Sequence, residues 1–192
     1  MNPDVWLLHG LNDFVGTVPI VDWMARFIVN DFAVPTAMSL VAVAIWFSGT
    51  IPEEQQRNRR AVIVVVLAIL FSNALIKDLA QFYFRPRPFA TESVKLLFYR
   101  PSVSSFPSIP IDVAFCFAMG LWYANKRLGN VLFALGALYA LSRVYAGVHY
   151  PSDVIAGALL GAGMVYIINR LKFVFEPLAN WLAETAQRLG FA

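Results

Sequence analysis

The sequence predicts an all-α membrane protein, a polytopic helix bundle with about five to six transmembrane helices. Hydrophobic residues make up 59% of the 192 residues and charged residues only 14%, and the mean hydropathy is +0.62. A soluble domain averages about 45–50% apolar and about 25% charged residues. Several apolar runs also approach the roughly 20 residues that a helix needs to cross a bilayer.

Four apolar runs in the later part of the chain predict spanning helices. The first is Ala61–Ile76, which continues through Phe84 and carries Lys77 and Asp78 near its far end. The others are Ile109–Ala124, Val131–Val148 and Val154–Ile168. Soluble core helices are the alternative, but so many long apolar runs in so short a chain favour a membrane bundle.

The N-terminal third predicts one further span, or two if it is split. Ile20–Phe47 is apolar but contains Asp22, Arg26 and Asp31, so only the part after Asp31 is uninterrupted. Pro35 marks either a kink or a helix start.

Two segments look amphipathic, Pro3–Phe14 and Pro177–Leu189, and are expected to lie at the membrane interface. No repeat, low-complexity tract or flexible linker divides the chain. We therefore expect one membrane-embedded domain of residues 1–192, with its sequence motifs between residues 77 and 161.

The basic residues of the connecting segments predict the orientation. One side of the membrane would hold three basic groups, which are Arg57, Arg59 and Arg60, then Lys126 and Arg127, then Arg170 and Lys172. The positive-inside rule makes that side cytoplasmic. The opposite, extracytoplasmic side would hold 84–106 and 149–153, whose arginines are then expected to serve chemistry. The pI near 9.2 indicates loops that face anionic lipid, and not nucleic-acid binding.

The strongest chemical signal is Ser142-Arg143, followed by His149 and Asp153. Asp153 lies four residues after His149, so it can select the tautomer of the imidazole and stabilise its charged form. The planar guanidinium of Arg143 suits phosphate oxygens. A purely structural His–Asp pair is the alternative.

Two further runs also predict anion binding. Arg85 and Arg87 alternate with prolines in the run 85–89, with Lys77 upstream, and can grip a phosphate; a basic interfacial anchor is the alternative. Ser108 closes a Ser-Phe-Pro-Ser run just before a span, where it is a natural N-cap, and Pro110 fits the first helical turn. A helix N-terminus of this kind binds anions, although a plain cap is the alternative.

Together these runs resemble the signature motifs of the type-2 phosphatidic acid phosphatase superfamily, with the greatest likeness to its bacterial undecaprenyl-diphosphatase members. The resemblance implies that His149 forms a phosphohistidine and that Asp153 orients it. It also implies a phosphate site, for which the candidates are Arg143, Arg87, Arg85, Lys77, Ser108 and Ser142. No metal or cofactor is expected. The resemblance further implies a bacterial-type inner membrane location.

Two departures from the family pattern stand out. The family lysine precedes the arginine of Arg-Pro by seven residues, whereas Lys77 precedes Arg85 by eight and Arg87 by ten. The Phe that follows Arg-Pro favours Arg87 as the equivalent arginine. The second departure is Pro110, which stands where the family has the histidine that protonates the leaving group, and proline cannot transfer a proton.

The main hypothesis is a membrane lipid phosphatase that hydrolyses an isoprenoid or glycerolipid phosphate, with undecaprenyl diphosphate as the leading candidate. Asp112, His9 or Glu92 would then replace the missing acid. Two alternatives stay open: a catalytically degenerate protein that binds or transports a polyprenyl phospholipid, and a lipid phosphotransferase.

Overall fold

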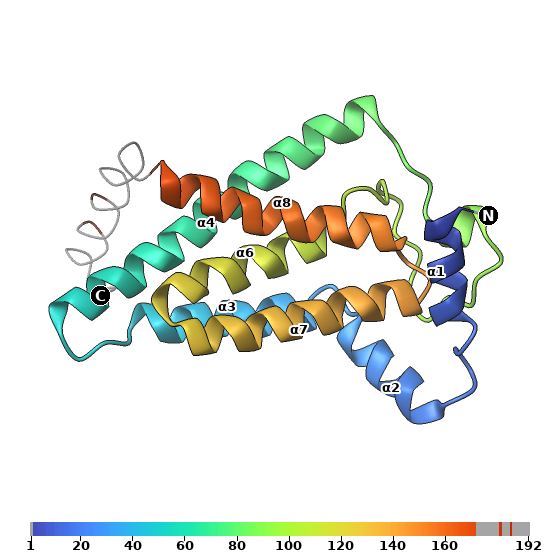
Figure 1. Cartoon of the computed structure of the whole chain (residues 1–192), viewed down its shortest axis with the longest axis horizontal. Helices are drawn as coiled ribbons and strands as arrows, with labels where there is room; N and C mark the ends of the chain where they lie inside the picture. The colour runs from blue at the N-terminus through green and yellow to red at the C-terminus, as the bar shows by residue number, and fades with distance from the viewer. Residues whose placement is uncertain (1, 172–180, 182–184, 186–192) are drawn as a thin grey trace.

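The computed structural model describes residues 2–171 together with residues 181 and 185, and this part of the chain is helical and without strands (Figure 1). Its helices are α1 (Pro3–Asn12), α2 (Pro19–Ile28), α3 (Ala33–Trp46), α4 (Pro52–Phe82), α5 (Pro88–Thr91), α6 (Ile109–Ala124), α7 (Lys126–Tyr145) and α8 (Pro151–Arg170). The predicted all-α class is therefore confirmed. The segment Pro177–Leu189, predicted to be amphipathic, lies largely outside the described residues.

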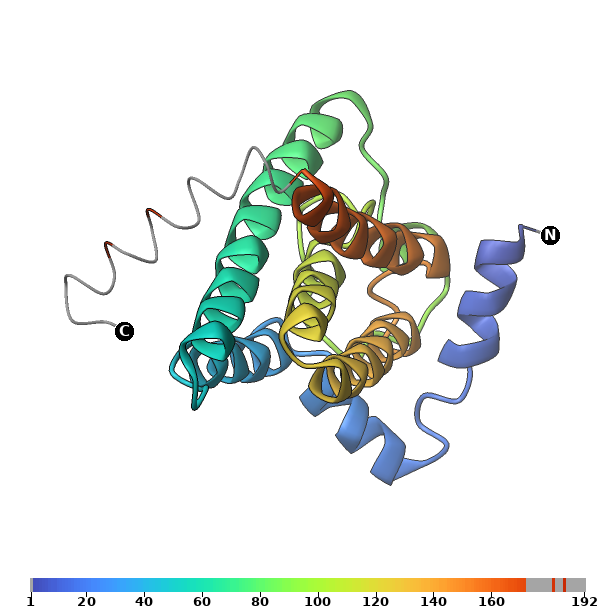
Figure 2. The same cartoon turned by 60° about the vertical axis from the view of Figure 1, so that its left-hand side comes forward.

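Helix α6 stands at the centre of the bundle. It packs against α3, α4, α7 and α8, which surround it when the bundle is viewed closer to end-on (Figure 2). Its core-facing residues include Ile111, Ala114, Ala118 and Leu121, all of which are fully buried. The central helix can therefore be short, because its neighbours shield most of its surface.

Three helices, α4, α7 and α8, are long and apolar enough to cross a membrane, and α6 is a shorter apolar helix. Helices α2 and α3 meet at a bend of 54° and together would make a fourth span. The predicted run Ile20–Phe47 is thus broken between Ile28 and Ala33. Pro35 lies in the first turn of α3 and marks a helix start, not a kink.

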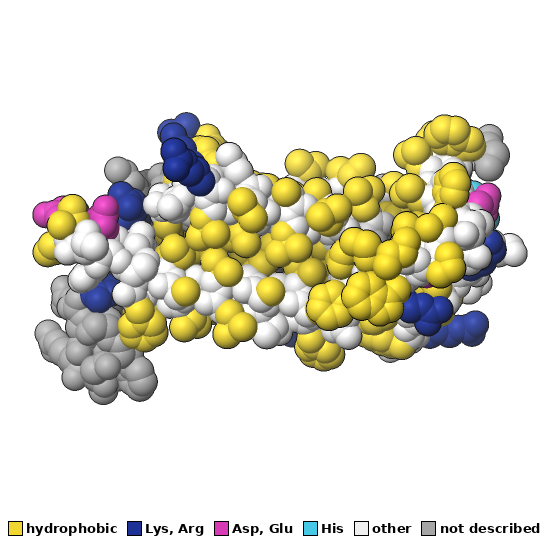
Figure 3. Space-filling view, turned by 90° about the horizontal axis from the view of Figure 1, so that it is seen from below, with side chains coloured by type: hydrophobic (Ala, Val, Ile, Leu, Met, Phe, Trp, Pro, Cys, Tyr) yellow, Lys and Arg dark blue, Asp and Glu magenta, His cyan; other side chains and the backbone are white. Residues whose placement is uncertain are grey.

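The surface agrees with a membrane setting. On the face shown in Figure 3, apolar side chains cover the middle of the molecule while charged side chains gather at its two ends. Large side chains exposed along the helices include Leu70, Val131 and Leu159. Exposed apolar area on this scale would be unfavourable in water and is favourable in lipid.

The two ends of the bundle differ in what they carry. One end holds the start of α4, the α6–α7 turn and the end of α8 (Figure 1), so the basic groups predicted to share a side do so where the structure describes them. The other end holds the segment 83–108 and the α7–α8 turn, with α1 lying across it (Figures 1 and 2).

Two glycines allow α8 to approach α6 closely. A Cβ atom at Gly161 would lie 2.2 Å from the carbonyl oxygen of Asp112, and one at Gly157 would lie 2.5 Å from that of Ser108. Backbone atoms cannot move aside as a flexible side chain can. Both positions therefore require glycine, and Gly157 brings α8 against the N-cap residue of α6.

We expect Gly161→Ala to lower the stability of the folded protein by about 1–3 kcal/mol, because the added methyl group overpacks the α6–α8 interface. Gly163→Ala is the matched control on the same helix, since its Cβ would meet no atom within 4 Å, and it should be neutral or slightly stabilising. Thermal unfolding in detergent measures both. Equal midpoints for the two variants would contradict the close approach.

Candidate active site

The candidate site forms where the α7–α8 turn meets the segment 83–108. The turn is closed by a hydrogen bond of 3.0 Å from the amide of Val148 to the carbonyl oxygen of Arg143. Gly147 has φ +72°, a left-handed conformation that side chains disfavour. This turn directs His149 inward, where only 1% of it is exposed.

The hydrogen bonds of His149 define its tautomer. Its Nδ1 lies 2.9 Å from the carbonyl oxygen of Ser105, and a carbonyl can only accept. Its Nε2 lies 3.0 Å from Nη1 of Arg87, and a guanidinium can only donate. The proton therefore sits on Nδ1, and Nε2 presents its lone pair to Arg87 and to the Ser108 hydroxyl, 3.3 Å away.

The surroundings also keep this imidazole neutral. Burial, reinforced by the positive charges of Arg143 and Arg87 and only partly offset by Asp153, lowers the pKa of His149 to about 3. Burial and the neighbouring Arg143 also lower the pKa of Arg87, to about 10, which leaves its guanidinium charged at neutral pH. The pair is thus a neutral base beside a cation.

Asp153 reaches the imidazole mainly through Ser105. Its Oδ2 lies 3.7 Å from Nδ1 of His149, too far for a direct hydrogen bond. The same oxygen accepts from the Ser105 hydroxyl at 2.5 Å and from the Tyr150 amide at 2.9 Å. Ser105 therefore connects Asp153 to the imidazole. Ser105 was missed as a site residue, although it opens the Ser-Phe-Pro-Ser run.

Arg87 is held in place by backbone carbonyls. Its Nε donates to Val103 at 3.0 Å, its Nη1 to Val148 at 3.3 Å and its Nη2 to Ser104 at 3.5 Å. These bonds join the segment 83–108 to the α7–α8 turn. The guanidinium is consequently fixed beside Nε2 of His149.

Arg143 is buried and binds residues of the segment that connects α2 and α3. Its Nη1 donates to Oδ1 of Asp31 at 2.6 Å and to the carbonyl oxygen of Val29 at 3.1 Å. Its Nε has no hydrogen-bond partner within the described residues. The position of Asp31 within the apolar run Ile20–Phe47 is thus explained, because this carboxylate compensates a buried cation.

Ser108 is the N-cap residue of α6, as predicted, but its hydroxyl makes no capping hydrogen bond. The hydroxyl faces His149 instead. Its own backbone amide donates to the carbonyl oxygen of Asp153 at 3.1 Å. The start of α6 is thereby tied to the start of α8, with the hydroxyl left for the site.

Three other predicted phosphate ligands do not contact His149. Arg85 pairs with Oδ1 of Asp153 and with Oδ2 of Asp4, each at 2.6 Å. Ser142 donates its hydroxyl to the carbonyl oxygen of Tyr139, one turn back in α7, at 2.7 Å. Lys77 is exposed on α4.

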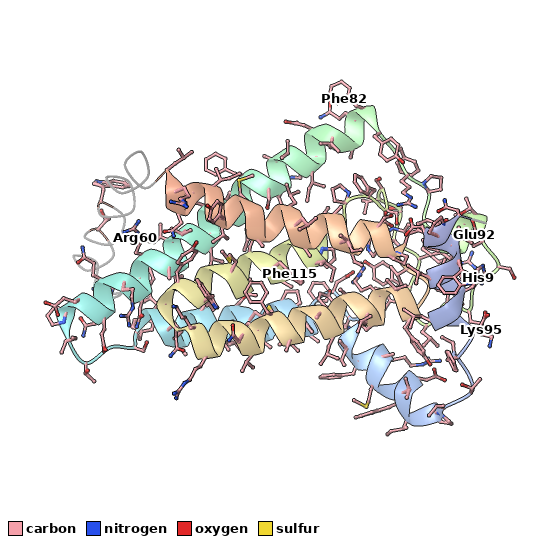
Figure 4. All side chains as sticks on the ribbon, viewed as in Figure 1. His9, Arg60, Phe82, Glu92, Lys95 and Phe115 are labelled. Carbon is pink, nitrogen blue, oxygen red and sulfur yellow. The ribbon has the colours of Figure 1, made fainter. Side chains whose placement is uncertain are left out.

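The candidate substitutes for the missing acid lie elsewhere. Asp112 accepts from the Ser72 hydroxyl of α4 at 2.6 Å. His9 and Glu92 face each other, with Nε2 and Oε2 4.0 Å apart, at the α1 end of the molecule (Figure 4). Within the described residues we find no contact between any of these three side chains and His149.

The chemistry of this arrangement is that of a nucleophile beside a fixed cation. A neutral nitrogen lone pair faces a fixed guanidinium and a hydroxyl, which suits an anionic electrophile such as a phosphoryl group. Within the described residues, no group of three or more His, Cys, Asp and Glu side chains is arranged to hold a metal ion.

Comparisons with known proteins identify the family of this chain. The PAP2 superfamily profile matches residues 61–176. The chain is 27% identical to undecaprenyl-diphosphatase BcrC of Bacillus subtilis over 184 residues, which cover 94% of this chain and 89% of the relative. It is 31% identical to the bacitracin transport permease protein BcrC of Bacillus licheniformis over 166 residues, covering 84% and 76%.

A solved structure shares the fold. The crystal structure of Aquifex aeolicus LpxE superposes with a TM-score of 0.69 at 27% sequence identity, covering 86% of this chain and 94% of that one. The profile match spans more than half of the chain and contains His149, Arg87, Ser105, Ser108 and Asp153. This chain therefore belongs to the PAP2 superfamily and is a membrane lipid phosphatase.

Proposed function

We propose that this phosphatase removes the terminal phosphate of an isoprenoid diphosphate, with undecaprenyl diphosphate as the leading candidate, through a phosphohistidine on His149. The observation that carries the proposal is the lone pair on Nε2 of a buried, neutral imidazole, 3.0 Å from the Arg87 guanidinium. A base of this kind needs no deprotonation before it attacks.

The reaction proceeds in two displacements. Nε2 bonds to the terminal phosphorus, and the bond from that phosphorus to the bridging oxygen breaks, so the lipid monophosphate leaves with the electron pair. Water then bonds to the phosphorus, and the P–N bond breaks and returns its electrons to Nε2. One water proton stays on the inorganic phosphate, and the other is released to solvent. Arg87, Arg143 and Ser108 would stabilise the phosphoryl oxygens, and the Nδ1–H bond to Ser105 would hold the cationic ring beside Asp153.

The leaving group decides which lipid suits this site. Pro110 lies in the first turn of α6 and carries no proton to donate. An alkoxide released from a phosphate monoester needs that proton, whereas a phosphate released from a diphosphate is already a good leaving group. The Bacillus subtilis relative is named as an undecaprenyl-diphosphatase, which supports the same substrate class.

We further propose that the His149 end of the bundle faces the extracytoplasmic side of a bacterial inner membrane. The opposite end carries Arg57, Arg59 and Arg60 at the start of α4, and Lys126 and Arg127 at the α6–α7 turn. The positive-inside rule assigns such an end to the cytoplasm.

We expect the purified protein to release phosphate from undecaprenyl diphosphate at least about 10²-fold faster than from phosphatidate, because general acid catalysis is typically worth 10²- to 10⁴-fold to a poor leaving group. Phosphate release in detergent micelles measures both rates, and His149→Ala controls for contaminating phosphatases. Equal rates on the two lipids would contradict the leaving-group argument. Tight lipid binding without turnover would contradict the catalytic role of His149.

The neutral state of His149 predicts how stability depends on pH. The imidazole has a pKa of 6.5 when unperturbed and about 3 in the folded protein. Between these values only the unfolded chain binds the proton, so this contribution to stability is complete above pH 6.5 and is lost as the pH falls toward 3. At pH 4.5 the loss amounts to about 2–3 kcal/mol.

His149→Gln should therefore lose less thermal stability than the wild type between pH 7 and pH 4.5. His9→Gln removes the other of the two histidines and is the matched control. Thermal unfolding midpoints across that pH range provide the measurement. Parallel pH curves for the wild type and His149→Gln would show that burial does not hold the imidazole neutral.

A further inference from the structure

We propose that Asp4, on the N-terminal helix α1, is a positioning residue for the phosphatase reaction. It holds Arg85 against Asp153, and Asp153 in turn holds Ser105 and the imidazole of His149. The inference rests on the proposed role of His149 as the nucleophile. Asp4 lies outside the residues that match the superfamily profile, and nothing in its sequence neighbourhood singles it out.

Both carboxylate oxygens of Asp4 bind groups at the site end of the bundle. Oδ1 accepts from the backbone amide of Ser152 at 2.8 Å, one of the amides that a helix start leaves without a partner. Oδ2 accepts from the Ser152 hydroxyl at 2.5 Å and from Nη2 of Arg85 at 2.6 Å. The Asp4 side chain is only 13% exposed, so these bonds are largely shielded from water.

Arg85 joins the two acidic side chains. Nη2 binds Asp4, while Nη1 binds Oδ1 of Asp153 at 2.6 Å and the Ser152 hydroxyl at 2.6 Å. The guanidinium also lies over the ring of Tyr150, with its carbon 4.1 Å from the ring centre. Planar geometry and two opposed acceptors define its orientation.

The chain of contacts then reaches His149. Arg85 occupies Oδ1 of Asp153 and leaves Oδ2 to accept from the Ser105 hydroxyl at 2.5 Å. The carbonyl oxygen of Ser105 accepts Nδ1–H of His149 at 2.9 Å. Four links therefore connect α1 to the tautomer that exposes the lone pair of Nε2.

The charge of Asp4 matters as well as its geometry. Arg85 is shared between two carboxylates, so Asp153 keeps part of its negative charge for the imidazole that becomes cationic during attack. Without Asp4, Nη2 of Arg85 loses its partner and the guanidinium can turn to bind Asp153 with both nitrogens. That rotation would compete with Ser105 for Oδ2.

A second contact docks α1 independently of Asp4. Asn12, at the far end of the helix, donates to the carbonyl oxygens of Lys95 at 2.9 Å and Tyr145 at 2.8 Å, and it accepts from the amide of Lys95 at 2.8 Å. It contacts neither Arg85 nor Ser152. Loss of helix docking and loss of positioning can therefore be separated by substitution.

The test compares Asp4→Asn with two variants at the C-terminal end of α1 in the full-length protein. Asp13→Asn removes an acid whose side chain is 76% exposed and should match the wild type. Asn12→Ala loosens α1 without touching Arg85. The substrate is undecaprenyl diphosphate, and kcat and KM are measured separately. The ¹⁵N resonances of the imidazoles are recorded in parallel, because the chain has only two histidines.

We expect Asp4→Asn to lower kcat by about 10- to 100-fold, as loss of a residue that orients a reacting group commonly does, with KM changed less than about twofold. We also expect it to shift the imidazole signals of His149, which His149→Gln assigns. Arg85→Lys should lower kcat similarly, and the double variant should lose no more than either single one.

A kcat for Asp4→Asn within about twofold of the wild type, or unshifted His149 signals, would overturn the inference. The inference would also be overturned if Asn12→Ala lowered kcat and shifted the His149 signals as much as Asp4→Asn does. Loss of α1 docking would then explain both effects without a positioning role for Asp4. If the wild type and Asp13→Asn release no phosphate, the proposed function fails. The resonances then still decide whether Asp4 acts on His149.

Discussion

The hydrogen bond from Nδ1 of His149 to the carbonyl oxygen of Ser105 is the interaction on which the site depends. It places the proton on one ring nitrogen and so leaves the other, Nε2, free to attack. The bond exists only when the segment 83–108 lies against the α7–α8 turn. Arg87 holds these two parts together through backbone carbonyls of both. The reactive tautomer of His149 therefore forms only together with the packing of the segment 83–108 against the α7–α8 turn.

Buried charges at this end of the bundle are compensated by acids from the N-terminal third of the chain. Asp31 pairs with Arg143, and Asp4 pairs with Arg85. An uncompensated charge in such a place would be costly, and removal of one partner of a buried pair typically costs about 3–5 kcal/mol. Asp4 and Asp31 thus support the site, although they lie far from its motifs in sequence.

Much of this architecture could be predicted from apolar runs and motifs. The helices around α6 follow directly from those runs, and the structure brings His149, Arg87 and Ser108 together as expected. Ser105 was not predicted as a site residue because it orients His149 through its backbone carbonyl, a group that every residue type carries. Asp4 and Asp31 were not predicted as site residues because their partners lie more than 80 residues away in the sequence. Ser142 donates its hydroxyl to the carbonyl oxygen of Tyr139 within α7, so its predicted phosphate contact stays a prediction.

The most direct test of the central claim is to trap the covalent intermediate. The wild type would be mixed with undecaprenyl diphosphate that carries ³²P in its terminal phosphate, quenched in base within one turnover, and digested. We predict an acid-labile, base-stable label on the peptide that contains His149. Label on a different residue, or phosphate release without any labelled protein during the pre-steady state, would contradict the account.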